Sequence, residues 1–107
     1  MAMDIDTQQR DGLCLATLAG EFTIYAAADA KARLTALLEA CAEVELDLSA
    51  VSEIDTAGFQ LLLLIKREAQ RLGKTVRFVA HSRTTLELID LYNMAAQLGD
   101  PLVIPAP

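Results

Sequence analysis

The sequence predicts a single small α/β domain, a mixed β-sheet of about four to five strands with helices chiefly on one face. Short stretches of strand-like sequence alternate with longer stretches whose apolar residues recur every three or four positions, which implies crossover connections and partly parallel strands. Residues 44–49 alternate strictly between apolar and polar, so one face of the sheet is expected to stay relatively polar. The chain has 107 residues, 53% of them hydrophobic and 22% charged, which is enough for one ordinary core.

Turn and capping residues separate the expected elements. Gly12 and Gly20 bound an apolar run that we interpret as a strand, paired in a hairpin with an earlier strand. Gly73 is a usual signal for the end of a helix, and Ser82 can cap the start of the next one. The expected strands lie at 3–7, 13–18, 44–49, 75–81 and 101–104, and the expected helices at 26–42, 56–72 and 82–91.

Charge and hydropathy exclude several function classes. The formal net charge is −6, with −8 in residues 1–55 and +2 in residues 56–107, and no aromatic residues interleave with the basic ones. A net-acidic chain of this kind is a poor nucleic-acid binder. The longest apolar run, residues 61–65, is far short of the ~20 residues of a membrane-spanning helix. With neither basic region nor apolar signal core at the N-terminus, we expect a cytoplasmic protein without direct membrane insertion.

Cysteine and histidine are scarce. Cys14 and Cys41 lie among Leu and Ala, and we interpret both as small buried thiols, with neither a disulfide nor a metal site. The single histidine, His81, is expected at the surface after a strand. These residues provide no set of zinc ligands and no Ser-His-Asp arrangement, and no glycine-rich phosphate loop is present. We therefore expect a protein that is not an enzyme and needs no cofactor.

The segment from strand 44–49 into helix 56–72 carries the most information. Asp55 or Thr56 can cap the helix, because its first backbone N–H groups lack intrahelical partners. On a helical wheel, Leu61, Leu62, Ile65, Ala69 and Leu72 form a core stripe. The outward stripe contains Thr56, Gln60, Leu63 and Arg67, with Phe59 and Leu64 at its flanks. This stripe can form a docking face, or Phe59 and Leu64 can pack under adjacent loops.

The run Asp55-Thr56-Ala57-Gly58, after Leu46-Asp47-Leu48-Ser49 and before a leucine-rich helix, resembles the STAS family of anti-sigma-factor antagonists and sulfate-transporter domains. Gly20-Glu21-Phe22 is similar to the end of the family's second strand. Residues 82–91, followed by Tyr92-Asn93-Met94, are similar to its third helix and next turn. The likeness spans nearly the whole chain, so we expect one STAS domain over residues 1–107.

The resemblance implies a protein-interaction module that switches partners. In bacterial antagonists, a serine/threonine kinase of the histidine-kinase-like ATPase type, which is also the anti-sigma factor, phosphorylates the turn, and a phosphatase reverses this. Thr56 is then the acceptor, and Ala57 leaves it as the one hydroxyl where many members have Ser-Ser. Many members also have Asp at the position of Thr23. The residues implied in partner binding are Asp55, Thr56, Ala57, Gly58, Phe59, Gln60, Leu63 and Arg67.

Two further resemblances leave the partner open. Residues 21–27 are similar to STAS proteins of bacterial chemosensory operons. The Asp-Thr-x-Gly turn and Leu91-Tyr92-Asn93 are similar to the STAS subunit of a phospholipid-transport ABC complex. In that second case the chain would dock on a transporter ATPase, with Thr56 as an interface hydroxyl and no phosphorylation switch. Nucleotide or small-ligand binding has little support, because no cradle for a phosphate is visible.

Overall fold

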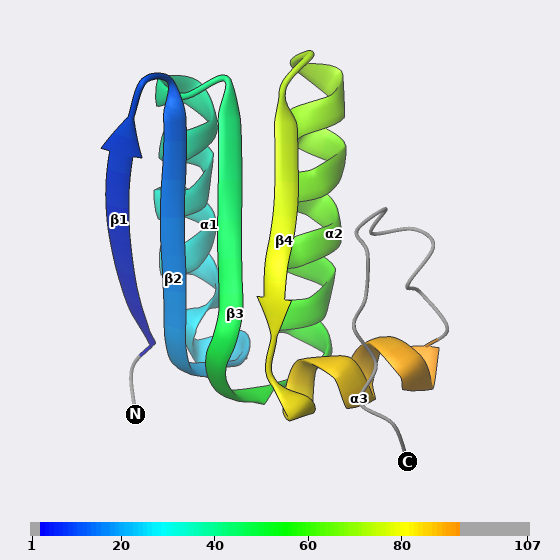
Figure 1. Cartoon of the computed structure of the whole chain (residues 1–107). Helices are drawn as coiled ribbons and strands as arrows, with labels where there is room; N and C mark the ends of the chain where they lie inside the picture. Colours follow the sequence, from blue (N-terminus) through cyan, green and yellow to red (C-terminus); the bar gives the residue numbers. More distant parts are fainter. Residues whose placement is uncertain (1–2, 93–107) are drawn as a thin grey trace.

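A computed structural model describes residues 3–92, which form four strands and three helices (Figure 1). The expected order of elements is confirmed, and most strands are longer than the sequence pattern indicates. The elements are β1 (Asp4–Arg10), β2 (Leu13–Phe22), α1 (Ile24–Ala40), β3 (Glu43–Ile54), α2 (Thr56–Arg71), β4 (Thr75–His81) and α3 (Arg83–Tyr92). The expected strand at 101–104 lies outside the described residues, and the expected turn at Tyr92-Asn93-Met94 lies outside them from Asn93 on.

The sheet is mixed, as expected, and its strand order is β1-β2-β3-β4. β1 and β2 are antiparallel and joined by Asp11 and Gly12, both with positive φ, which is the backbone that a two-residue hairpin requires. β2, β3 and β4 are parallel, and the crossovers place α1 and α2 on the same face of the sheet (Figure 1). α3 lies at the end of the sheet where the parallel strands finish.

The two faces of the sheet differ in chemistry, as the alternation in β3 predicts. Val44, Leu46 and Leu48 are buried under the helices. The residues between them are acidic and lie on the uncovered face. There the Glu45 carboxylate forms an ion pair with the guanidinium of Arg77 in β4, with 2.7 Å between nitrogen and oxygen. The core therefore sits between the sheet and the α1–α2 layer.

Cys14 and Cys41 form a disulfide, which corrects the prediction of two free thiols. Both side chains are buried, as expected. Cys14 lies in β2 and Cys41 caps the C-terminus of α1, and this packing brings their α-carbons to 6.0 Å, within bridging range. Local composition and redox compartment, on which the prediction rests, do not report which distant cysteines the fold brings together.

Two smaller predictions are also wrong. Leu72, assigned to the core stripe, is exposed, because α2 ends at Arg71 and the chain turns at Gly73 with a positive φ. His81 is the last residue of β4, and its ring nitrogens are shielded from solvent rather than at the surface.

The cap of α3 is confirmed, since the Ser82 hydroxyl accepts a 3.1 Å hydrogen bond from the backbone N–H of Thr85. No helix within residues 3–92 is long and apolar enough to cross a membrane.

Candidate functional site

The Asp55 carboxylate caps two helices at once. Its Oδ1 accepts a 3.0 Å hydrogen bond from the backbone N–H of Gly58 in the first turn of α2. Its Oδ2 accepts a 2.9 Å hydrogen bond from the backbone N–H of Ile24, the first residue of α1. Thr23 stands at the N-cap of α1 without a capping side-chain hydrogen bond, so Asp55 supplies from a distant segment what the local sequence does not. The capping role considered for Asp55 is therefore confirmed and is wider than expected.

These hydrogen bonds stabilise the ionised form of Asp55. The bond from Gly58 has the largest effect and lowers the pKa of the carboxyl group below its usual value. Desolvation opposes this shift, and the bond from Ile24 lowers the pKa further. The side chain is therefore ionised at neutral pH. Its negative charge lies at the positive ends of two helix dipoles, which is a favourable placement.

Gly58 is needed because α2 begins very close to the end of β2. A β-carbon at position 58 would lie 2.2 Å from the carbonyl oxygen of Phe22, much closer than any side chain tolerates. The backbone N–H of Asp55 donates to the same oxygen at 3.3 Å. The glycine in the Asp-Thr-x-Gly turn thus seats the first turn of α2 against the sheet and is itself buried.

The residues predicted for partner binding separate into three groups. Phe59 is only 2% exposed and belongs to the core, so the prediction that it flanks the outward stripe as a partner-binding residue is wrong. The close seating of Gly58 explains this, because it draws the adjacent side chain inward. Leu63 is half-buried and packs against the core, less outward than expected. Exposed are Thr56, Gln60 and Arg67; half-buried are Asp55, Ala57 and Leu63; buried are Gly58 and Phe59.

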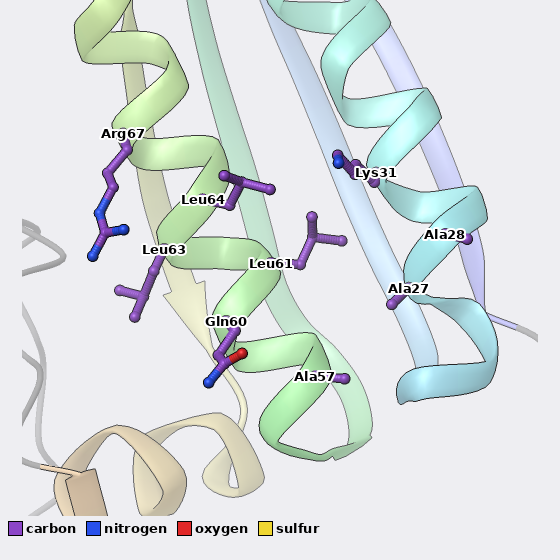
Figure 2. A pocket seen from close by; sticks show the side chains of 9 residues that line it. All are labelled: Ala27, Ala28, Lys31, Ala57, Gln60, Leu61, Leu63, Leu64 and Arg67. Carbon is purple, nitrogen blue, oxygen red and sulfur yellow. The ribbon is translucent and has the colours of Figure 1, made fainter.

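A shallow groove of about 560 Å³ runs between α1 and α2, and Ala57, the residue after Thr56, is part of its lining (Figure 2). Leu64 of α2, 40% exposed, points toward α1, and Lys31 of α1 points toward α2. Leu63 and Arg67 lie on the outer side of α2. The lining residues are Ala27, Ala28 and Lys31 from α1 and Ala57, Gln60, Leu61, Leu63, Leu64 and Arg67 from α2.

The contribution of α1 to the groove was not predicted from the sequence. Its first two residues, Ile24 and Tyr25, are 64% and 96% exposed, an unusual place for two large side chains with apolar surface. Ala28, which lines the groove, is four residues after Ile24 and three after Tyr25, so it is a neighbour of both on the helix surface. The available signal was topological: parallel strands end at one edge, and the helices that follow β2 and β3 must start there together.

The family model of Mlab, STAS domain, matches residues 5–104. The chain belongs to the STAS family. A curated STAS relative, the intermembrane phospholipid transport system binding protein MlaB of Haemophilus influenzae, is 44% identical over 52 residues. The matched stretch is 49% of this chain and 50% of that protein, so the match spans about half the length of the relative.

Solved structures carry the same STAS fold. An anti-sigma factor antagonist from Mycobacterium paratuberculosis superposes with a TM-score of 0.82 at 17% identity, covering 95% of this chain and 87% of that one. The Bacillus cell fate determinant SpoIIAA in its phosphorylated form gives 0.70 at 16% identity, covering 92% of each chain. At these identities the likeness is one of fold.

Proposed function

We propose that this STAS domain is a non-enzymatic interaction module, an accessory subunit that docks on the ATPase of an ABC transporter for phospholipids. The observation that carries the proposal is the exposed Thr56 at the start of α2, next in the chain to Ala57 of the α1–α2 groove. The match to MlaB supports a transporter ATPase as the partner over the anti-sigma-factor kinase and the chemosensory proteins that the sequence resemblance left open. The proposal places the chain on the cytoplasmic side, where the ATPase binds its nucleotide.

The docking face follows from how the turn is built. Both oxygens of Asp55 already accept backbone hydrogen bonds, so this side chain positions the turn rather than contacting the partner. Thr56 then offers a hydroxyl at a fixed place, and Gln60 and Arg67 provide further polar groups along the exposed side of α2. Ala57 and the half-buried Leu63 provide apolar surface between them. Such a mixed patch is typical of a specific protein interface.

A phosphorylation switch is the second candidate function, because the exposed Thr56 is also accessible to a kinase. A phosphate would add about −1.5 to −2 charges at pH 7. The start of α2 favours an anion, whereas the neighbouring ionised Asp55 opposes one. An apolar partner surface closing over that charge would have to desolvate it, so binding would change more than folding. In this case the partners are a histidine-kinase-like ATPase acting as anti-sigma factor and kinase, a phosphatase, or chemosensory proteins.

The test begins by isolating the native protein with its bound proteins and identifying them by mass spectrometry. We expect a transporter ATPase; recovery of only a histidine-kinase-like ATPase would favour the switch, and recovery of neither would overturn both. Binding of the purified ATPase is then measured with Thr56→Ala and Thr56→Glu. As an accessory subunit, the domain loses binding in both variants and is unphosphorylated in cells.

A switch gives a different result with the same variants. The Ala variant keeps its affinity for the partner, and the Glu variant binds at least ~10-fold more weakly, equivalent to about 1.4 kcal/mol. Thr17→Ala and Thr17→Glu are the matched controls, because Thr17 is exposed in β2 on the uncovered face of the sheet. Equal losses at Thr17 and Thr56 would contradict a docking face at the start of α2.

A further inference from the structure

We propose that the α1–α2 groove binds an amphipathic, acidic helix of the partner protein. The inference deepens the proposed function and rests on it, because Ala57, the residue after Thr56, lines the groove. It adds a second contact surface, on α1, and it specifies the chemistry of the segment that this surface receives.

The shape of the groove fits a helix. Its walls are two neighbouring helices on the same face of the sheet (Figure 2). Ala27, Ala28 and Ala57 keep the lower part of the groove open, because alanine side chains are short. A surface between two packed helices presents a furrow into which the side-chain ridge of a third helix fits. An extended strand would gain nothing comparable, since helical walls offer no unpaired backbone groups for it to bind.

The apolar surface is larger than the groove itself. Leu64 is exposed in the groove, and Ile24 and Tyr25 are exposed in the first turn of α1, four and three residues before Ala28. Exposed apolar side chains that gather next to a groove indicate an interaction site more strongly than isolated ones do. Tyr25 is suited to anchor a partner, because tyrosine combines large contact area with a hydroxyl and is enriched at interfaces.

Charge selects the partner segment. The whole chain has a net charge of −6, yet the charged residues that line the groove are the cations Lys31 and Arg67. They flank its apolar part, Lys31 from α1 and Arg67 from the outer side of α2. Lys31 is within electrostatic range of Glu68, which pairs with Arg71, whereas Arg67 makes no ion pair within residues 3–92. An apolar ridge with Asp or Glu at its sides would complement this arrangement.

Site-specific crosslinking in the native host tests the inference. A photoreactive residue replaces Ala28 of α1 or Leu64 of α2 for the part of the groove between the helices, Gln60 for its edge on the exposed side of α2, and Thr17 as the control on the uncovered face of the sheet. We expect crosslinks from Ala28 and Leu64 to a partner segment with apolar residues three and four apart and acidic residues beside them. Crosslinks from Gln60 without any from Ala28 or Leu64 would overturn the inference and leave the proposed function standing. Loss of all crosslinks would contradict both.

Charge reversal is the second arm. The double variant Lys31→Glu, Arg67→Glu should bind the purified ATPase at least ~10-fold more weakly, and the wild-type affinity should fall with added salt. Arg10→Glu, Arg83→Glu is the matched control, because it makes the same change in net charge at exposed positions on β1 and α3. Replacing the crosslinked acidic residues by lysine should restore binding to the reversed variant. Equal losses in both double variants, or binding of the wild type to anionic lipid vesicles through the same two cations, would overturn the inference.

Discussion

The carbonyl oxygen of Phe22 occupies the place where a side chain at Gly58 would begin. A β-carbon built on Gly58 would lie 2.2 Å from that oxygen and 3.1 Å from the Ile54 side chain. The end of β2 and the first turn of α2 are therefore in backbone contact. This contact sets the depth at which α2 sits and so the positions of Thr56 and Asp55.

The first prediction concerns this contact. Gly58→Ala should reduce the free energy of unfolding by about 1–3 kcal/mol, because the methyl group forces the start of α2 away from β2. The backbone N–H of Ile24 should also lose protection from hydrogen exchange, since Asp55 moves with α2. Gly73→Ala is the control: it strains a positive φ but has no neighbour within 4 Å, so Ile24 should stay protected. Unchanged exchange at Ile24 in Gly58→Ala would show that the helix start does not move.

The second prediction concerns pH. Because the folded-state pKa of Asp55 is lowered, its ionised form adds stability above the unfolded pKa of about 4, and this is lost as pH falls through the folded pKa. Denaturant titrations below pH 5 should show a shallower loss of stability for Asp55→Asn than for the wild type. At neutral pH, Asp55→Ala should cost more than Asp55→Asn, at ~1 kcal/mol per lost cap. Identical pH profiles for Asn and wild type would contradict the double cap.

The third prediction separates core from docking surface within α2. Leu62 is fully buried, so Leu62→Ala should reduce the free energy of unfolding by about 2–5 kcal/mol. Leu64 is partly exposed in the groove, and Leu64→Ala should cost less than ~1 kcal/mol while weakening partner binding. Thermal unfolding and an affinity measurement on both variants check this. Equal thermal losses would place Leu64 in the core.

The fourth prediction concerns the Cys14–Cys41 disulfide. The two cysteines are 27 residues apart, and closing a loop of that length stabilises a fold by roughly 3–4 kcal/mol in the chain-entropy model. Oxidised protein should therefore unfold at a higher denaturant concentration than reduced protein. The reduced form should still fold, because the core contains many other buried apolar side chains. Alkylation and mass spectrometry verify the redox state, and the Cys14→Ala, Cys41→Ala variant should behave like the reduced protein in both redox conditions.

Much of the fold could be predicted from the sequence because the apolar spacing differs so clearly between strands and helices. The alternation in β3 and the stripe at Leu61, Leu62, Ile65 and Ala69 gave the buried faces directly. Predictions failed where contacts between distant segments decide the outcome. The pairing of Cys14 with Cys41 depends on how α1 packs on β2, and no local pattern reports it.

The candidate site follows the same division: positions that depend on one helix were predicted, and positions that depend on contacts between distant segments were not. Thr56, Gln60 and Arg67 lie outward, as one helix alone dictates. Phe59 is buried because α2 approaches β2 so closely, which a helical wheel cannot represent. The bond from Asp55 to Ile24 and the role of α1 in the groove both need two helices to start side by side.

Helix α1 is tied at both ends by groups from elsewhere in the chain. Asp55 holds its first residue, and the disulfide at Cys41 holds its last turn to β2. The Lys74 ammonium also donates to the carbonyl oxygen of Leu38, near the same end. The side of the groove that α1 forms is thus held in place before any partner binds. Association therefore carries no entropic cost for ordering this helix. Removing the Asp55–Ile24 hydrogen bond or the Cys14–Cys41 disulfide should therefore weaken partner binding, although neither group contacts the partner.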